Sequence, residues 1–397
     1  MPSPPTAVLR RSPAWVAGLL PLAVLAVAVA AFVGLGAPGL ERNGIPVEEL
    51  SVEKTTLRPG QIEVLVRNDG PDPVALRQVL VNDGFARFTQ THREVGRLGS
   101  DKVTVDYPWI EGEAYTVTLL TATGGTVDAV VDVAAETPGT DAGFLGLMAL
   151  VGLYVGVIPV AIGMLWLPWV RRIDQRYVRF LLAVTLGLLA FLGIDALLEG
   201  TEFAGQGAQA FGGAALVFLG AAVAYLGLTG VDARLRRARG TGGPAAWRLA
   251  FLVALGIGLH NLGEGLAIGS AYAIGSLALG ASLIVGFALH NTTEGLAIVA
   301  PVARAEEEPR GSLRRLAGLG LLAGGPAVVG AWLGASAFNT SAAAFMFGLG
   351  AGAIAQVIVQ IAPSVRDDEG RLATPATTGG VILGLVLMYT TGLMISL

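Results

Sequence analysis

Long apolar segments recur along the chain, separated by short polar connections. An α-helix rises 1.5 Å per residue, so about 20 apolar residues cross the ~30 Å hydrocarbon core of a bilayer. Nine segments reach this length: 14–36, 142–169, 178–199, 209–229, 247–270, 276–302, 316–337, 342–363 and 378–396. The pattern predicts a polytopic α-helical membrane protein, in which residues 1–40 form an N-terminal transmembrane anchor and residues 138–397 an eight-helix domain.

Residues 41–137 follow another pattern, because apolar and polar residues alternate with the period of two that is typical of half-buried strands. The alternation is clear in "IEVLVRN" and "YTVTLL", and Asn68-Asp69-Gly70 and Asn82-Asp83-Gly84 are turn signals between strands. The segment predicts a small β-sandwich of immunoglobulin-like type. Such a domain presents its edges to a protein partner or pairs with its own copy, and we expect a homodimer.

The positive charges predict the orientation of the chain. Outside residues 41–137, every Lys and Arg falls on the N-terminus or on alternate loops: Arg10 and Arg11; Arg171, Arg172, Arg176 and Arg179; Arg234 to Arg248; Arg304 to Arg315; Arg366 and Arg371. By the positive-inside rule the N-terminus is cytoplasmic, and residues 41–137 and the C-terminal Leu397 are extracytoplasmic. We therefore expect a multi-pass protein of the cell (plasma) membrane. Its first helix exceeds the usual apolar length of a signal peptide, which remains the alternative to an anchor.

Composition agrees with a membrane location and narrows the chemistry. The chain is 53% hydrophobic and 14% charged, and its mean hydropathy is +0.65. The 56 glycines favour close helix packing, whereas the absence of cysteine excludes disulfides and thiolate metal sites. A net charge of −4 gives no support for binding nucleic acid.

A polar motif occurs twice within the most apolar part of the chain, as "HNLGEG" at 260–265 and "HNTTEG" at 290–295. Residues four apart share a helix face, so the His and Glu of each copy project together. The two helices run in opposite directions, with three helices before and three after them. This predicts a 3+2+3 inverted-repeat bundle with its site at mid-depth. The candidate metal ligands are His260, Asn261, Glu264, His290, Asn291 and Glu294.

The glutamates of the motif need a charge partner that the helices do not provide. Apart from Arg179 and Arg248 at the ends of their spans, no Lys or Arg lies within the spans from residue 142 onward. A charged side chain at the bilayer centre costs about 2.5–3.5 kcal/mol, so Glu264 and Glu294 must bind a cation or be protonated. Imidazole, amide and carboxylate ligands suit Zn²⁺, Fe²⁺ or Mn²⁺ better than Cu⁺. The alternative is a hydrogen-bond network that joins the helices, with the glutamates protonated.

The sequences "HNLGEGLAIG" and "HNTTEGLAI" resemble the fourth- and fifth-helix signatures of the ZIP family of divalent metal transporters, and the resemblance covers about 142–397. It implies an eight-helix transporter that carries a divalent cation, zinc foremost and otherwise iron or manganese, into the cytoplasm. It also implies that His260, Glu264 and Glu294 are principal ligands, that Asn261 and Asn291 belong to an adjacent site, and that His290 lines the same pathway.

The chain departs from the family pattern at three positions. Gly263 stands where many members have Pro, Gly325 precedes Pro326 where many have Glu, and Gln360 stands where an acid is common. The second metal position therefore has fewer carboxylates, and we expect one tightly held cation.

Two other classes of function remain open. One is an intramembrane hydrolase in which a cation on His260, Glu264 and Glu294 activates water, although no HExxH motif is present. The other is a receptor or scaffold that acts through residues 41–137 and an unknown protein partner. We expect a transporter rather than an enzyme, with the cation as its substrate and no other cofactor.

Overall fold

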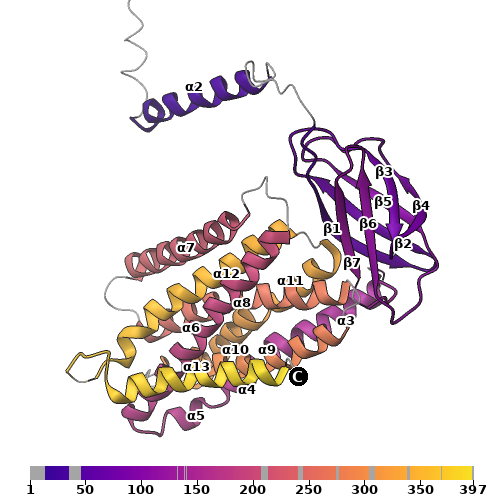
Figure 1. The fold of residues 1–397 in the computed structure, drawn as a ribbon. Coiled ribbons are helices and arrows are strands. Elements are labelled where there is room, and N and C mark those ends of the chain that lie inside the picture. Colours follow the sequence, from indigo (N-terminus) through magenta and orange to yellow (C-terminus); the bar gives the residue numbers. More distant parts are fainter. Residues whose placement is uncertain are drawn as a thin grey trace, which may run out of the picture. The chain divides into compact units, whose positions relative to one another are not determined.

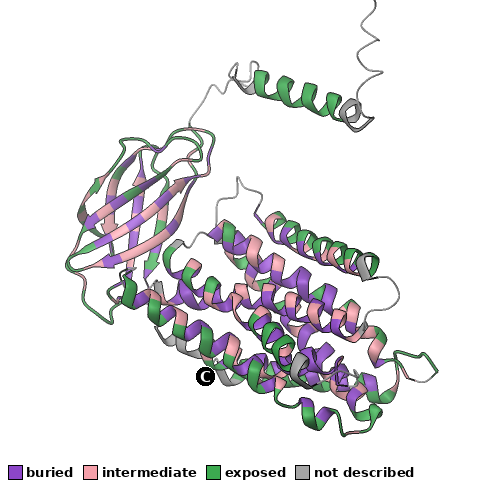
Figure 2. Ribbon diagram, turned by 180° about the vertical axis from the view of Figure 1, so that it is seen from behind, coloured by how far each residue is buried: buried purple, intermediate pink, exposed green. Residues whose placement is uncertain are grey.

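The computed structural model describes residues 14–34, 46–131, 133–137, 139, 141–206, 213–239, 245–273, 277–303, 309–337, 340–367 and 369–395. Parts of the predicted anchor region, Arg304 of the predicted inner loops and Leu397 lie outside these ranges. The chain divides after Pro46 into two compact units. The first contains helix α2 (Ala14–Gly34), in which every side chain described is exposed (Figure 2). Such a helix suits a lipid environment, because its apolar residues pack on no other part of its unit.

The second unit begins with seven antiparallel strands (Figure 1). They are β1 (Leu50–Arg58), β2 (Gln61–Asn68), β3 (Leu76–Val81), β4 (Gly84–Gln90), β5 (Ser100–Asp106), β6 (Tyr115–Thr121) and β7 (Thr126–Val131). Alternate residues form the core of this domain, as in β2, where Ile62, Val64 and Val66 are fully buried. The alternating segments of the sequence thus form the strands that their pattern predicts.

The strands form one continuous sheet in the order β1-β2-β5-β4-β3-β6-β7. A sandwich would have two separate sheets. Here β4 joins them, because it pairs with β3 through its first residues and with β5 through its last. The open edges also approach each other: the Leu57 N–H donates to Thr137 Oγ1 (2.9 Å), and the Thr137 N–H donates to the Leu57 carbonyl (3.0 Å). The predicted sandwich is therefore nearly a closed barrel. Its strand order keeps the immunoglobulin-type succession, and the Tyr115 hydroxyl accepts from the Ile110 N–H, as in a tyrosine corner.

The helical bundle contains a helix at each of the eight apolar segments that follow the sheet. The first segment is interrupted: α3 (Ala142–Gly152) passes through a π-helical turn, η1 (Leu153–Val157), into α4 (Ile158–Met164) and the short α5 (Leu167–Val170). The others are α6 (Gln175–Gln206), α7 (Ala215–Arg239), α8 (Ala245–Ala273), α9 (Leu277–Val299), α10 (Pro309–Gly324) continued by α11 (Pro326–Ala337), α12 (Thr340–Ile361) continued by a 3₁₀ turn, η4 (Ala362–Val365), and α13 (Pro375–Ile395). Seven stretches of the described residues are long and apolar enough to cross a membrane.

Helices α8 and α9 lie side by side within the bundle, and α8 is among its most buried helices (Figure 2). α8 packs on α11, and α9 packs on α4. In the same way α7 packs on α12, and α13 packs on α6. Glycine allows the closest of these contacts, since a Cβ atom at Gly265 would lie 2.0 Å from the Ala327 carbonyl oxygen and one at Gly330 would lie 2.1 Å from that of Leu262. The backbones of α8 and α11 are thus in direct contact.

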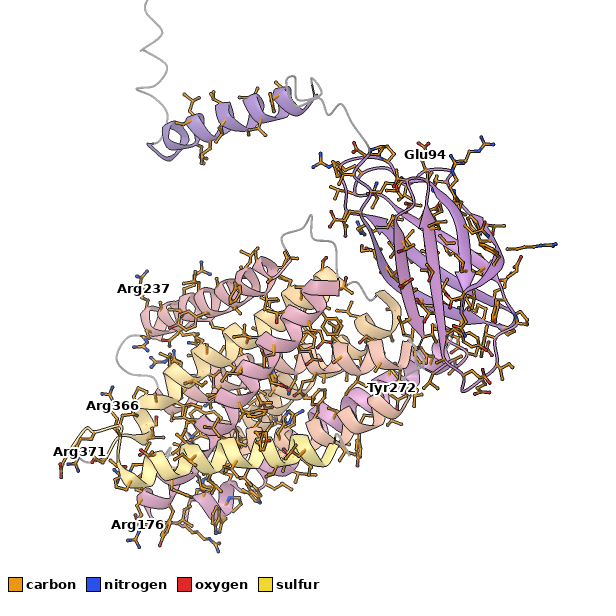
Figure 3. All side chains as sticks on the ribbon, in the orientation of Figure 1. Glu94, Arg176, Arg237, Tyr272, Arg366 and Arg371 are labelled. Atoms are coloured by element: carbon orange, nitrogen blue, oxygen red, sulfur yellow. The ribbon has the colours of Figure 1, made fainter. Side chains whose placement is uncertain are left out.

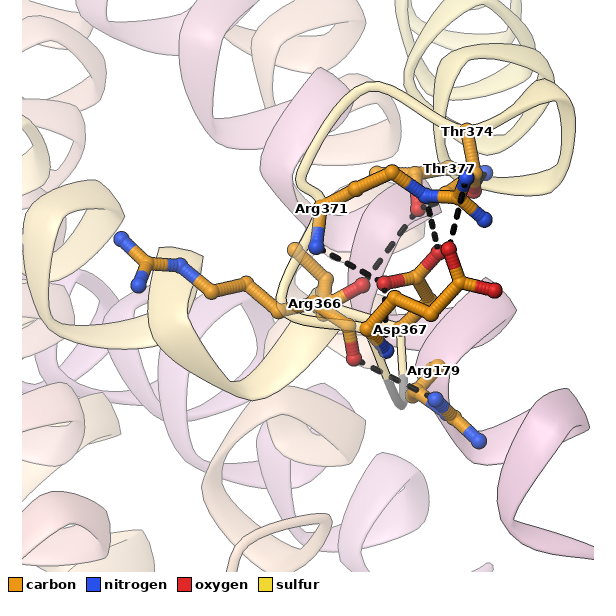
Figure 4. Close-up of polar contacts among 8 residues, drawn as sticks. Arg179, Arg366, Asp367, Arg371, Thr374 and Thr377 are labelled. Atoms are coloured by element: carbon orange, nitrogen blue, oxygen red, sulfur yellow. Dashed lines mark hydrogen bonds and ion pairs between the residues drawn. The ribbon is translucent and has the colours of Figure 1, made fainter.

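The arginines gather at one end of the bundle. Figure 3 shows Arg176, Arg237, Arg366 and Arg371 at this end, with Tyr272 at the opposite end. We call this the arginine end. The loop after η4 is held there by the contacts drawn in Figure 4, in which the Arg371 N–H and Nε donate to Asp367 (2.7 and 2.9 Å). Desolvation opposes the charge of Asp367, but these hydrogen bonds lower the pKa of its carboxyl below the ordinary value.

Candidate metal-binding site

The six predicted ligands lie on the two central helices. His260, Asn261 and Glu264 belong to α8, and His290, Asn291 and Glu294 belong to α9. All six side chains are buried. The two copies match position by position: each His is 6% exposed, each Asn 0% and each Glu 2%. The duplicated sequence thus produces two equally enclosed sets of polar groups.

Glu264 lies at the centre of the polar contacts. One of its oxygens, Oε1, lies 3.1 Å from His260 Nε2 and contacts His290 Nε2, while Oε2 accepts a hydrogen bond from Asn291 Nδ2 (2.9 Å). One potential ligand atom each from His260, Glu264 and His290 lies within 4.8 Å of the other two. The family resemblance alone implied only that His290 lines the pathway, whereas the structure brings this candidate ligand into the same group as His260 and Glu264.

The two asparagines are held by main-chain carbonyls at irregular turns. Asn261 Nδ2 donates to the Ala323 carbonyl (3.0 Å), just before the break between α10 and α11. Asn291 Nδ2 donates to the Val155 carbonyl (3.1 Å) inside the π-helical turn η1. Because each amide nitrogen is used in this way, each amide oxygen is left for another partner. Both Oδ1 atoms are buried and accept no hydrogen bond from the described part of the chain.

Further buried acceptors lack partners in the other half of the group. Neither carboxylate oxygen of Glu294 has a partner in hydrogen-bond geometry within the described ranges, although the Asn261 side chain interacts with this carboxyl. His260 Nε2 lies 3.1 Å from Glu264 Oε1 but is not in hydrogen-bond geometry with it. A buried polar group without a partner costs about 1–3 kcal/mol, and a charged one costs more. These atoms are carboxylate oxygens, amide oxygens and an imidazole nitrogen, a ligand set that fits a borderline divalent cation. One cation can satisfy several of them together, whereas one proton satisfies a single atom.

Acidic residues of α6 adjoin this group. Asp195 interacts electrostatically with His260, His290 and Glu264. The neighbouring Ala196 is buried in a cluster that contains residues of α8, α9 and α12, so this part of α6 lies beside the site. Asp195, Glu199 and Glu202 are spaced four and three apart, which places them on one face that runs toward the end of the helix. The sequence alone is compatible with an entry path, a proton relay or solvated helix-end charges for Asp195 and Glu199.

A second polar network at the arginine end was missed in the sequence. Asp232 of α7 is buried, with Arg236 Nη2 at 2.7 Å and Arg248 Nε at 3.2 Å, and it accepts a hydrogen bond from Gln360 Nε2 (3.1 Å). Gln360 therefore contacts Asp232, not the six-residue group. The available signal was an acid four residues before an arginine, but that pattern is also typical of an exposed helix face. The network ties α7, α8 and α12 together.

No protein-family model matches the sequence, and no curated protein matches it significantly.

Proposed function

We propose that the protein is a divalent-cation transporter of ZIP type, with zinc as the foremost substrate and iron or manganese as alternatives. The observation that carries this proposal is the duplicated, fully buried His-Asn-x-x-Glu group, in which several acceptor atoms have no hydrogen-bond partner within the described residues. A divalent cation matches the charge of two carboxylates, Glu264 and Glu294, and takes the nitrogen and oxygen ligands that this group offers.

The packing of the bundle supports an inverted repeat of the 3+2+3 type. A twofold axis in the membrane plane that exchanges α8 with α9 would also exchange the α8–α11 contact with α9–α4, and the α7–α12 contact with α13–α6. All four contacts occur. The irregular turns fit the same relation, because η1 and the α10–α11 break each supply a carbonyl to one motif asparagine. Transporters of this class bind substrate between repeats, beside interrupted helices.

The charge distribution gives the proposed route a direction. We place the arginine end in the cytoplasm of a plasma-membrane protein by the positive-inside rule. Asp195, Glu199 and Glu202 then lead from the extracytoplasmic end of α6 to the site, and their carboxyl oxygens are the ligands that this part of the proposed route offers to a cation. The cation would leave on the side where the arginines lie. We further propose that residues 41–137 serve assembly as a homodimer or bind a protein partner outside the cell.

Uptake into proteoliposomes, measured across Zn²⁺, Fe²⁺, Mn²⁺ and Mg²⁺ together with the metal content of the purified chain, tests this function. We expect saturable uptake of the transition metals and weak uptake of Mg²⁺, which prefers oxygen ligands alone. Glu369→Gln, on the exposed α12–α13 loop, is the matched control for loss of one acidic charge. Turnover of a lipid or peptide without uptake would instead indicate the hydrolase, and neither activity would indicate the scaffold.

A further inference from the structure

An apolar groove lies on the bundle at the point where three helical segments meet. Its volume is about 430 Å³, and it is lined by Trp166 and Trp169 around α5, Leu181 of α6 and Leu296 of α9. The two tryptophans are 43% and 51% exposed although they are the largest apolar side chains of this segment. Tryptophan is enriched at membrane–water interfaces, where the apolar ring meets lipid and the N–H reaches polar groups. The groove thus has the character of an interfacial surface.

Positive charge follows the groove directly in the chain. Residues 166–181 contain four arginines and one acid, Asp174. Arg176 stacks on the Tyr177 ring and donates to its hydroxyl (3.2 Å), whereas Arg171 and Arg172 are exposed and form no ion pair with the described residues. Arg171 is two residues from Trp169. An apolar groove whose lining residues are followed in the chain by these exposed guanidinium groups is complementary to a molecule with an apolar chain and an anionic head.

We propose that this groove binds an anionic phospholipid of the surrounding bilayer. One acyl chain lies between Trp169, Leu181 and Leu296, and the phosphate contacts Arg171 and Arg172, since guanidinium groups bind phosphate through paired hydrogen bonds. The arginine end is the end expected to face the cytoplasmic leaflet, which carries the anionic lipids. This site is separate from the six-residue group and does not depend on its function.

The lipid would touch the helix that carries one motif copy. Leu296 follows Glu294 by two residues on α9. Thr292 lies on the same helix, and a Cβ atom at Gly163 of α4 would lie 1.9 Å from its carbonyl oxygen. α4 and α9 are therefore in backbone contact beside the groove. A chain that fills the groove therefore packs against α9 next to its backbone contact with α4.

Native mass spectrometry of the full chain, released from nanodiscs that contain phosphatidylglycerol and phosphatidylcholine in equal amounts, tests the proposal. We expect preferential retention of phosphatidylglycerol. Removing both charges by Arg171→Gln and Arg172→Gln should weaken this retention about fivefold for each charge. Arg366→Gln, an exposed arginine of the same end that does not adjoin the groove residues in sequence, is the control and should leave retention unchanged.

Two further variants separate the parts of the proposal. Trp169→Ala should weaken the retention of both lipids, because it removes a wall of the groove but no charge. Arg171→Lys with Arg172→Lys should keep most of the preference. Equal retention of the two lipids by the unaltered chain would overturn the proposal, as would a double Gln variant that behaves like the control. A Trp169→Ala variant that changes the oligomeric state without losing lipid would assign the groove to a second copy of the chain instead.

Discussion

The two copies of the His-Asn-x-x-Glu-Gly motif have the same burial but different partners. In one set, His290 and Asn291 both contact Glu264, although Asn291 Oδ1, like Asn261 Oδ1, has no hydrogen-bond partner among the described residues. In the other set, the Glu294 oxygens have no partner in hydrogen-bond geometry within the described residues, although the Asn261 side chain interacts with this carboxyl. His260 Nε2 lies 3.1 Å from Glu264 instead. Identical chemistry thus occurs in two states within one chain. A repeated motif specifies which groups are enclosed, whereas the surrounding helices decide which of them pair.

The helices that surround the two motif copies also pack differently. α8 packs extensively on α12, whereas the equivalent pair under the proposed twofold axis, α9 and α6, has few contacts. An exact symmetry would make these two contacts alike. In a transporter built from inverted repeats, exchange between two such unequal arrangements changes the side from which the site is reached. A single structure of such a transporter shows one of the two arrangements, so the proposed function predicts this asymmetry.

The largest expected effect is loss of transport when either glutamate is removed. Glu264→Ala and Glu294→Ala should both abolish divalent-cation uptake, because each deletes a charged ligand while relieving the cost of burying a carboxylate. Both variants should still insert in the membrane. Uptake of radioactive zinc into proteoliposomes is the measurement, with Glu369→Gln as control. Transport at the rate of the unaltered protein in either variant would contradict the proposed site.

The Glu264→Ala and Glu294→Ala variants should differ in stability when no metal is bound. Glu264 has three side-chain partners, so Glu264→Ala leaves buried polar groups unpaired and should destabilise the metal-free protein by about 1–3 kcal/mol. Glu294→Ala removes a carboxylate that lacks hydrogen bonds in the described structure and should be neutral or stabilising. Thermal unfolding in detergent with a chelator distinguishes the two. Equal destabilisation would show that the two motif copies pair alike.

A smaller difference is expected between the asparagines. Asn291 Nδ2 donates to both Glu264 and the Val155 carbonyl, whereas Asn261 Nδ2 donates to the Ala323 carbonyl. Asn291→Ala should therefore destabilise the metal-free protein by about 1 kcal/mol more than Asn261→Ala, the net value of one hydrogen bond. The same unfolding assay measures this difference. The reverse order would mean that the carbonyl contact of Asn261 is the stronger anchor.

Metal stoichiometry sharpens the comparison further. Because Gly325 and Gln360 provide no carboxylate, we expect one tightly held cation per chain, close to the group of His260, Glu264 and His290. Anomalous scattering from crystals grown with zinc would locate it. Two positions of equal occupancy would show that both motif copies hold metal at once.

The smallest effect should follow from removing the external domain. Deletion of residues 41–137 leaves both motif copies unchanged, so we expect uptake to persist while oligomeric state or partner binding changes. Uptake by the deleted chain and its mass in detergent are the measurements. Complete loss of uptake in a deleted chain that is inserted and still dimeric would place the domain on the route of the cation.

Hydrophobic period and turn residues were sufficient to predict most of the architecture. Each predicted apolar segment contains a helix in the structure, and the alternating segments of residues 41–137 form strands. Alternation reflects a strand that is buried on one face, whereas a long continuous apolar run reflects a helix in apolar surroundings on all sides. The six motif residues were also found, since polar groups in an apolar span are conspicuous.

Details that depend on exact backbone geometry were not predictable. Nothing in "LYVGV" distinguishes a π-helical turn from an α-helix, yet this turn supplies the acceptor for Asn291. The pairing of β4 with both β3 and β5 joins the two halves of the predicted sandwich into one sheet, and no local pattern encodes a shared strand. Asp232 was overlooked because its partners Arg248 and Gln360 are distant in sequence.

The contact between α8 and α11 also determines how the protein tolerates change. At Gly265, Gly269, Gly330 and Gly334 a methyl group would lie 2.0 to 2.2 Å from a carbonyl oxygen of the facing helix, whereas Gly227, Gly230 and Gly392 have open space. Saturation mutagenesis should therefore reveal two populations of glycine with similar sequence surroundings. One accepts alanine freely and even gains helix propensity, and the other accepts no substitution at all. Because the intolerant positions lie on both helices, a larger residue could replace one of these glycines during evolution only if the facing helix moved away at the same time.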